Sequence, residues 1–310
     1  MAFTEQQNLA IVRTELDSVF YQNFDYTDTF PGIASASTAA LFKPMNTTHA
    51  AYIEEIFKGS GLFSNIGETT TVPLSTPSVT NKLTTYIKDF ASGIEISKNL
   101  FDDNMHGVWS KTVADFAMVA RVTQDDNAFD LFRDAFTTAL TADGSAICAT
   151  HTLIGGGTVV NNSTAALSTT SLNTGIVALR QKKNQAGVIL GNVPTVLLVP
   201  SALFKKAVEI TESALLADTA NNNINVYRSA YGITVFTSPY LDAAAGGSDT
   251  AWFLLSKNHA VTRLIRQGIQ TALRSWEYSN NRTYLYQANF RETVYCPDYV
   301  GVWGSTGTVA

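Results

Sequence analysis

Charged side chains are scarce in this 310-residue chain. Asp, Glu, Lys and Arg make up 15% of it, against about 25% in a typical soluble protein. Uncharged polar residues, mainly Thr, Ser and Asn, take their place, and a surface of that kind costs little to desolvate, which favours extensive protein contact. The net charge of -5 and the sequence pI of about 5.4 exclude the overall basic character that is typical of nucleic-acid-binding domains.

Cysteine and long apolar runs are also lacking. Cys148 and Cys296 lie far apart, so they predict no disulfide framework and fit a reducing compartment. No run of about 18 apolar residues occurs, so we expect no membrane-spanning helix and no membrane partner. Residues 1–7 lack the basic-then-apolar pattern of a secretory signal. Hydrophobic residues still make up 45% of the chain, enough for a substantial core, and the length predicts about two domains.

Motifs that carry chemistry are missing as well. Cys148 and His151 are three residues apart, as in half of a zinc site, but no second pair has a matching spacing. The glycine run at 155–157 is not followed by the helical pattern that a phosphate loop needs. No GxSxG nucleophile motif occurs. The sequence therefore predicts no catalytic, cofactor-binding or metal-binding residues, no cofactor, and a protein that is not an enzyme.

Small clusters of charge have a structural explanation. Acids beside a long helix could act as acid/base groups, but they are more often helix caps or parts of a solvated face. Short groups of Lys and Arg residues are usually part of a solvated surface. We interpret all of these clusters in that way: Asp102–Asp103 with His106, Asp125–Asp126, Lys182–Lys183, and Arg263 with Arg266.

The first 66 residues read as an N-terminal arm. Leu9, Val12 and Leu16 have helical spacing, which predicts a helix over 5–20. Residues 25–48 are rich in Ala, Ser and Thr and predict an extended segment that needs another surface to lie on. A short helix is predicted over 49–58, ended by the glycines at 59 and 61.

Residues 67–98 are predicted to form a long β-hairpin that projects from the body. The segments 69–74 and 84–97 are rich in β-branched and alternating apolar residues, and they contain or flank Pro73 and Pro77. Proline is tolerated in edge strands but not in central ones. A ten-residue arm would reach about 30 Å, and a lone hairpin is marginal in water, so it must rest on something.

A long helix is predicted within residues 99–144. Apolar residues recur at helical spacing from Trp109 to Leu140. Asp102–Asp103–Asn104 form a suitable N-cap region, whose two acids suit the N-terminal end of the helix, and Asp143–Gly144 would end it. The polar residues 124–127 suggest a kink. About thirty residues span roughly 45 Å, so the helix would be a spine across a domain.

From residue 145 onward the pattern is mixed. A domain is predicted over 145–280, with helices over 171–186 and from Ser201 to about 216, and strands over 195–200, 234–236 and 251–255. Residues 281–310 alternate again and would return beside the spine helix. An arm, a projecting hairpin and a lone spine helix do not make a self-sufficient monomer, since ordering exposed extensions costs entropy that partner contacts must offset. We infer an obligate, closed homo-oligomer.

The order of these parts resembles that of HK97-type major capsid proteins of tailed double-stranded DNA phages. Several stretches also look alike, in the same order along nearly the whole chain. They are residues 90–103 (hairpin into spine helix), 128–136 and 143–147 with His151 (helix end and exit), 196–203 (first strand and helix of the axial domain), and 238–242 with 251–255 (later axial strands).

The resemblance implies an α+β fold of the HK97 type. Its parts would be an N-terminal arm (1–66), an extended hairpin loop (67–98), a peripheral domain with its spine helix (99–144) and return strands (281–310), and a mixed α/β axial domain (145–280). It also implies pentamers and hexamers that form an icosahedral head around double-stranded DNA. The hairpin would lie over a neighbour, and axial loops near 220–225 or 243–248 would meet at the centre of each ring. The resulting candidates for inter-subunit contact are Lys82, Tyr86, Lys88, Asn222, Asn223, Gly246 and Gly247.

The expected partners are other copies of the chain, a separate scaffolding protein, a portal and a decoration protein, with weak, non-specific contact to packaged DNA. The expected location is the virion capsid, assembled in the host cytoplasm. Two alternatives remain open. One is an encapsulin-like shell that encloses cargo enzymes, and the other is an α/β enzyme whose site carries no recognisable motif. Particles with DNA, particles with a co-purified enzyme, or a bound cofactor would distinguish the three.

Overall fold

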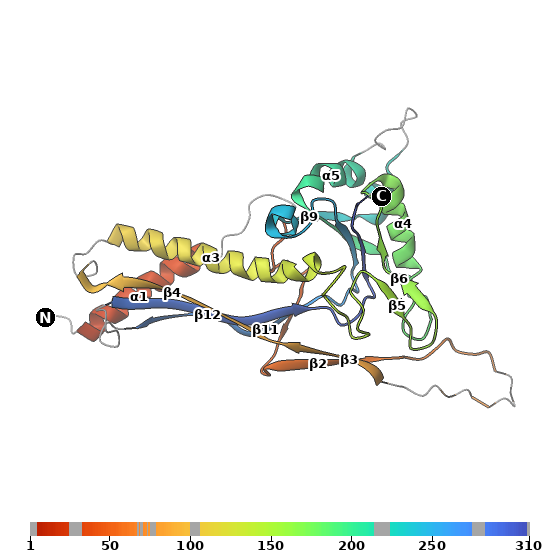
Figure 1. Ribbon diagram of the computed structural model, residues 1–310, viewed down its shortest axis with the longest axis horizontal. Helices are drawn as coiled ribbons and strands as arrows, with labels where there is room; N and C mark the ends of the chain where they lie inside the picture. The colour runs from red at the N-terminus through yellow and green to blue at the C-terminus, as the bar shows by residue number, and fades with distance from the viewer. Residues whose placement is uncertain are drawn as a thin grey trace.

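The molecule is elongated, with a helix-on-sheet layer at one end, a mixed domain at the other and a long hairpin beneath (Figure 1). This computed structural model describes residues 5–24, 33–66, 68, 71–72, 74, 79–99, 106–213, 224–274 and 283–308. The described residues mix helices with strands in two main sheets. The α+β class predicted from the sequence is therefore confirmed.

The peripheral layer is a four-stranded sheet covered by two helices. Its strands, in order across the sheet, are β1 (Lys43–Asn46), β11 (Thr262–Arg274), β12 (Thr283–Tyr295) and β4 (Lys88–Ser97). Helices α1 (Glu5–Phe24) and α3 (His106–Arg133) pack side by side on one face. Alternate residues of β12 face them, and the buried rings of Phe20, Phe116 and Tyr286 form the centre of this core.

Helix α3 confirms the spine predicted from apolar spacing. Trp109, Val113 and Phe116 are buried against the sheet, as their spacing requires. At about 1.5 Å per residue, its 28 residues span about 42 Å. The helix ends at Arg133 and not at 143–144, because turns replace the helical ladder from residue 134 onward. Residues 124–127 stay helical, and the predicted N-cap region 102–104 lies outside the described residues.

The axial domain is built on a five-stranded sheet that buries both faces. Across the sheet the strands are β7 (Asn162–Ser163), β13 (Val302–Ser305), β10 (Trp252–Ser256), β8 (Pro194–Val199) and β9 (Thr234–Thr237). Helices α4 (Thr169–Arg180) and α5 (Phe204–Glu212) cover one face. The last turns of α3 and the chain that follows it cover the other. The short apolar run at 195–200 is thus a central strand, as predicted.

The axial helices are shorter than the sequence suggested. Ser168 and Ser171 form a reciprocal capping box at the start of α4, and this helix ends at Arg180, six residues before the predicted end. The helix predicted from Ser201 begins only at Phe204, because Ser201 opens a 3-10 turn, η1 (Ser201–Leu203), in which its backbone N–H donates to Asp242 Oδ1 at 2.7 Å.

Smaller elements complete the description. They are the hairpin of β5 (Thr150–Thr152) and β6 (Thr158–Val160), the π-helical turn η2 (Tyr227–Tyr231), and the 3-10 turns η3 (Pro239–Leu241) and η4 (Ala243–Ala245). The glycine run at 155–157 is the turn between β5 and β6. Gly156 and Gly157 there have positive φ, which fits the loop predicted in place of a phosphate site.

The projecting hairpin exists, but its strands differ from the prediction. Strand β2 (Ala51–Phe57) pairs antiparallel with β3 (Val79–Tyr86), so the helix predicted over 49–58 is wrong. That segment is too short for a helix to be stable alone, and pairing with β3 satisfies its backbone groups. Strand β4 pairs with β12 across ten residues, so 88–97 belongs to the peripheral sheet and not to the hairpin.

The predicted boundaries of the axial domain also need correction. Strand β11 pairs along its length with β12, so the boundary at 280 falls between two paired strands of the peripheral sheet. Strand β13 lies between β7 and β10, so the end of the predicted return segment 281–310 is part of the axial sheet. Both corrections concern pairings between residues far apart in sequence, which local patterns do not specify.

Candidate assembly surfaces

The hairpin carries a concentration of exposed apolar side chains. Phe63 is 98% exposed and Leu74 92% exposed. Nine of the 21 exposed large apolar side chains among the described residues lie on it: Ile53, Phe57, Leu62, Phe63, Ile66, Val72, Leu74, Val79 and Tyr86. Exposed apolar side chains gathered on one extension are typical of interaction surfaces.

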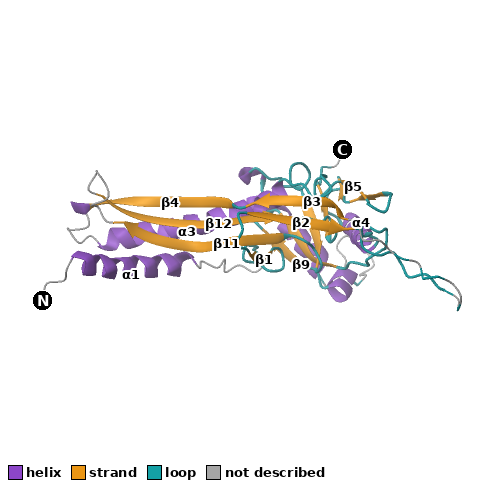
Figure 2. Ribbon diagram, turned by 90° about the horizontal axis from the view of Figure 1, so that it is seen from below, coloured by secondary structure: helices purple, strands orange, loops and turns teal. Residues whose placement is uncertain are grey.

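The base of the hairpin is fixed to the body. Tyr295 donates its hydroxyl hydrogen to Glu54 Oε2 at 2.7 Å, and its ring packs against that of Tyr52, 5.9 Å between centroids. Burial, followed by the bond and charge of Glu54, raises the pKa of Tyr295, so this hydroxyl remains a donor at neutral pH. The hairpin leaves on the side of the sheet away from α3 and extends past the axial end (Figures 1 and 2). It therefore begins from a rigid anchor and ends clear of its own body.

The predicted contact residues fall in different places. Lys82 and Tyr86 lie on β3 with exposed side chains, and both remain candidates. Lys88 opens β4 and is held by its own spine helix, where it donates to Asn127 Oδ1 at 2.9 Å and lies 3.7 Å from Asp130. Asn222 and Asn223 lie outside the described residues.

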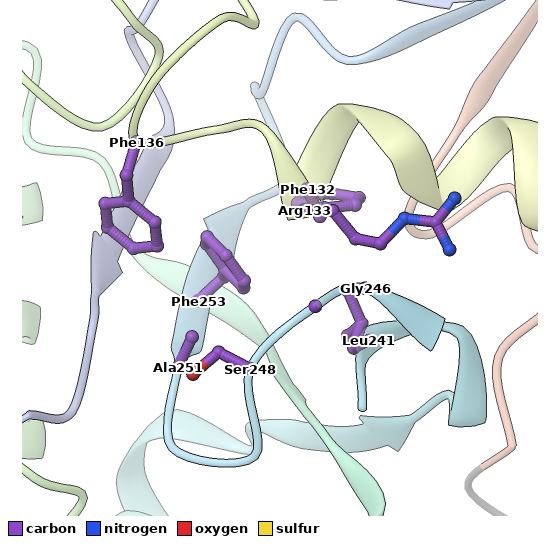
Figure 3. A pocket seen from close by; sticks show the side chains of 9 residues that line it. Phe132, Arg133, Phe136, Leu241, Gly246, Ser248, Ala251 and Phe253 are labelled. Carbon is purple, nitrogen blue, oxygen red and sulfur yellow. The ribbon is translucent and has the colours of Figure 1, made fainter. Parts of the chain in front are cut away.

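Gly246 and Gly247 lie against the end of the spine helix. They line a small cavity of about 90 Å³ with Phe132, Phe136 and Phe253 (Figure 3). A Cβ at position 247 would stand 2.1 Å from the carbonyl oxygen of Leu241, so only glycine fits this close turn. The loop is part of the joint between spine helix and axial sheet, and contact with a neighbour there remains a prediction.

Arg133 holds that joint together. Its guanidinium pairs with Asp126 at 2.6 Å and with Asp130, and it also donates to the carbonyls of Tyr240 and Ala245. Burial alone would lower the pKa of Arg133, but the hydrogen bonds and charges of the two carboxylates outweigh it and raise the pKa. The side chain therefore stays positively charged and links α3 to the 240–245 loop.

Residues 33–42, the segment before β1, lie over the spine helix and are called the strap. The backbone N–H of Ala36 donates to Asp125 Oδ1 at 2.6 Å, and Arg121 donates to Ser35 and Ser37 at 2.9 Å each. Asp125 was predicted to be solvated, but it is buried. Two polar side chains beside it, Gln124 and Asn127, are buried as well, so the polar run 124–127 marks a docking site and not a kink.

Arg263 is a second charged residue that was predicted to be solvated, and this prediction is wrong. It is buried in the peripheral sheet and bonds to Glu292 Oε2 at 2.5 Å through Nη2 and at 3.1 Å through Nε. Burial raises the pKa of Glu292, and the charge of Arg263 opposes that rise. Because Arg263 also reaches the carbonyl oxygen of Ala36, the pair lies directly beneath the strap.

His259 supports the same strap from the axial side. Its Nδ1 accepts from the N–H of Val261 at 3.2 Å, so Nε2 is left to donate to the carbonyl of Ala40 at 3.1 Å. Burial, with help from the nearby charge of Lys43, lowers the pKa of His259 to about 4. The imidazole is therefore neutral at physiological pH.

Cys148 and His151, whose spacing is that of half a zinc site, belong to a buried polar cluster. His151 is bonded through Nδ1 to Asp143 Oδ2 at 2.8 Å, and burial raises the pKa of the Cys148 thiol to about 12. A neutral, buried thiol is a poor metal ligand. Among the described residues no three His, Cys, Asp or Glu side chains are grouped to hold a metal ion. Lys182, predicted to be solvated, is buried beside this cluster.

A further apolar surface lies on the helix side of the peripheral sheet. Phe90 and Phe290 stack at 4.9 Å and line an open groove of about 230 Å³ with Phe116 and Val119 of α3. Met118 and Val122 are exposed nearby.

None of the helices described here is long and apolar enough to cross a membrane.

Comparison with known protein families gives the class of this protein. A profile of the phage capsid protein family matches residues 80–303, well over half of the chain. The chain therefore belongs to the phage capsid protein family and is a structural capsid protein. A search of curated proteins gave no significant match.

Solved structures support the fold. The capsid of bacteriophage PhiM1 in its mature form is similar with a TM-score of 0.60 and 11% identity, covering 90% of each chain. A protein of Microbacterium phage Oxtober96 gives 0.55 and 11%, covering 91% of this chain and 94% of that one. A virus-like particle from Pyrococcus furiosus gives 0.57 and 7%, covering 94% and 98%. The predicted HK97-type fold is confirmed, and the family match does not favour the encapsulin-like alternative.

Proposed function

We propose that copies of this chain close into the pentamers and hexamers of an icosahedral phage head, with the hairpin of each subunit lying over a neighbour. The observation that carries this proposal is the hairpin itself. Its base is anchored by Glu54 and Tyr295, while apolar side chains such as Phe63 and Leu74 find no cover on their own subunit. Contact of one patch with a different patch on the next copy is head-to-tail, and repeats of such contacts close rings.

The shell would be formed in the host cytoplasm on a separate scaffolding protein and joined to a portal, with a decoration protein as a further partner. Contact with packaged double-stranded DNA would be weak and non-specific, since the net charge of -5 supplies no strong phosphate-binding term. Lys82 and Tyr86 on β3 are the candidates for contact with the neighbour, followed by Asn222 and Asn223 at the ring centre.

Negative-stain electron microscopy of the expressed chain, alone and with its scaffolding protein, tests the proposal. We expect closed particles of uniform size, or pentamers and hexamers that convert to particles when the scaffold is added. A chain that stays monomeric at micromolar concentration under both conditions would contradict it. Particles that enclose a co-purified enzyme would favour the encapsulin-like alternative.

A further inference from the structure

Among the described residues, Lys182 is a buried cation with no carboxylate partner. It follows α4, is 1% exposed, and lies 5.9 Å from the ring centre of Tyr299. Its Nζ donates to Asn161 Oδ1 and, at 3.3 Å, to the carbonyl oxygen of Val160. No carboxylate among the described residues lies within 4.0 Å of Nζ. A buried ammonium usually needs such a partner, so another role for this amine has to be considered.

The amine is partly neutral near physiological pH. Burial lowers the pKa of Lys182 to about 8, and the neighbouring Cys148 opposes that shift only in part. At pH 8 about half of the side chains then carry a free lone pair on Nζ. A neutral lysine amine is a nucleophile, and the lowered pKa of a buried lysine is one way in which proteins activate it.

The group next to this nucleophile is a carboxamide held in one orientation. The side chain of Asn161 is fully buried, its Oδ1 accepts from Lys182, and its Nδ2 donates to the carbonyl oxygen of Ile147 at 2.6 Å. The Asn161 backbone is fixed too, because its N–H donates to the carbonyl oxygen of Ala149 at 2.8 Å. The amine and the amide are thus fixed in contact before any reaction, which removes most of the entropic barrier to bond formation.

A proton donor lies beside the amide nitrogen. His151 Nε2 faces the same oxygen of Ile147, at 3.1 Å, that Asn161 Nδ2 contacts. Its Nδ1 faces Asp143 Oδ2 at 2.8 Å. Both ring nitrogens therefore face oxygen atoms, which holds the ring in one orientation. Asp143 orients this ring as the third group of a catalytic triad orients its base.

We propose that Lys182 and Asn161 form an isopeptide bond within one chain. The Nζ lone pair of neutral Lys182 attacks Cγ of Asn161 and forms a C–N bond. The bond from Cγ to Nδ2 then breaks, Nδ2 leaves as ammonia with a proton relayed by His151, and His151 regains a proton from the attacking nitrogen. One amine and one primary amide become one secondary amide and one ammonia, with no oxidant or other reactant needed.

The bond would lock the axial domain at a point where three segments meet. Residue 161 enters β7, residue 182 follows α4, and Tyr299, which also bonds to the carbonyl oxygen of Lys183, precedes β13. The surroundings exclude water, since Ile147, Cys148 and Tyr299 are all buried, so hydrolysis of the amide does not compete.

The intact mass of the purified full-length chain under denaturing conditions tests the proposal, after incubation at pH 8. The expected mass is lower than that of the sequence by one ammonia, and proteolysis should release the peptide with Asn161 covalently joined to the peptide with Lys182. A chain of full mass after prolonged incubation would overturn the proposal. A mass deficit located in a succinimide, with Lys182 free, would overturn it equally.

Three variants separate chemistry from structure. Lys182→Arg keeps the charge but removes the nucleophile, and it should have the full mass. Asn161→Asp should still react, but with loss of one water in place of ammonia, a result that a purely structural hydrogen bond cannot give. His151→Gln should lengthen the half-time at least about tenfold, and an unchanged half-time would overturn the role given to His151.

Discussion

The axial body and the projecting hairpin use the same residue types in opposite ways. In the body, Leu197 and Leu198 on β8 are fully buried between two cores. On the hairpin, Leu62 is 81% exposed and Phe63 98%. Burial of one such side chain stabilises a structure by about 1.5–3 kcal/mol. The body therefore obtains this energy within one chain, whereas the hairpin can obtain it only from another.

The largest effect should come from removing the hairpin's apolar surface. Replacing Leu62, Phe63 and Leu74 by serine should abolish particle assembly while the free energy of unfolding of the unassembled subunit changes by less than about 0.5 kcal/mol per site. The two quantities are read by electron microscopy and by urea unfolding. Particles of normal yield from the triple variant would show that these side chains do not form the interface.

One substitution made in both regions sharpens the comparison. Phe129→Ala removes a ring that packs against Phe42, at 5.3 Å between centroids, in the core below the strap. It should destabilise the subunit by about 3–5 kcal/mol. Phe63→Ala makes the same chemical change on the hairpin and should leave subunit stability unchanged. Equal losses in urea unfolding at the two sites would contradict the division between body and arm.

A pH-dependent loss of stability should be specific to the body. The pKa of His259 is about 4 in the folded chain and about 6.5 when unfolded, so the unfolded state binds the proton more tightly. The contribution of neutral His259 to the free energy of unfolding is therefore fully present above pH 6.5. It is lost as the pH falls toward 4, by up to about 3 kcal/mol.

His259→Gln is the matched control for this pH effect, since its amide can still donate to the carbonyl of Ala40. Burial also raises the pKa of Glu292, so the useful quantity is the difference between the two proteins in urea unfolding from pH 7 to pH 4.5. Curves that stay parallel over this range would show that His259 does not titrate as its burial indicates.

Much of the body could be predicted from the sequence because its signals are local. The apolar spacing of Trp109, Val113 and Phe116 places α3, and the apolar run at 195–200 places β8. The end of α3 could not be placed, because Phe136 continues the helical spacing yet packs from a turn against Phe253. The hairpin was misassigned for a related reason: β2 and β3 are separated by more than twenty residues, so nothing local identifies the pair.

The charged residues of the site show the same limit more strongly. Asp125, Lys182 and Arg263 all looked solvated, and each is buried against a partner distant in sequence. One signal was present in the sequence: Gln124 and Asn127 are polar residues on a helix whose neighbouring turns are apolar. This pattern fits a buried polar contact, although it was interpreted as a kink. Lys182 carried no such signal, since its environment comes from three separate segments.

Asp125 offers a moderate test of how the strap joins the body. Asp125→Ala removes the acceptor of the Ala36 N–H and leaves that buried donor unsatisfied, which should cost about 1–3 kcal/mol. Hydrogen exchange of the Ala36 amide should become faster, while amides of β2 and β3 should exchange as before. Faster exchange along the hairpin as well would show that the strap and the hairpin are coupled, contrary to the separation argued above.

The smallest effect compares one serine from each region. Ser168 caps α4 and bonds reciprocally with Ser171 at 2.8–3.1 Å, so Ser168→Ala should cost about 1 kcal/mol of subunit stability. Ser64 is an exposed residue of the hairpin, and Ser64→Ala should have no measurable effect on unfolding. Both chains should still assemble, since neither serine contributes apolar surface. A loss at Ser64 equal to that at Ser168 would mean that the hairpin is stabilised by contacts within its own subunit.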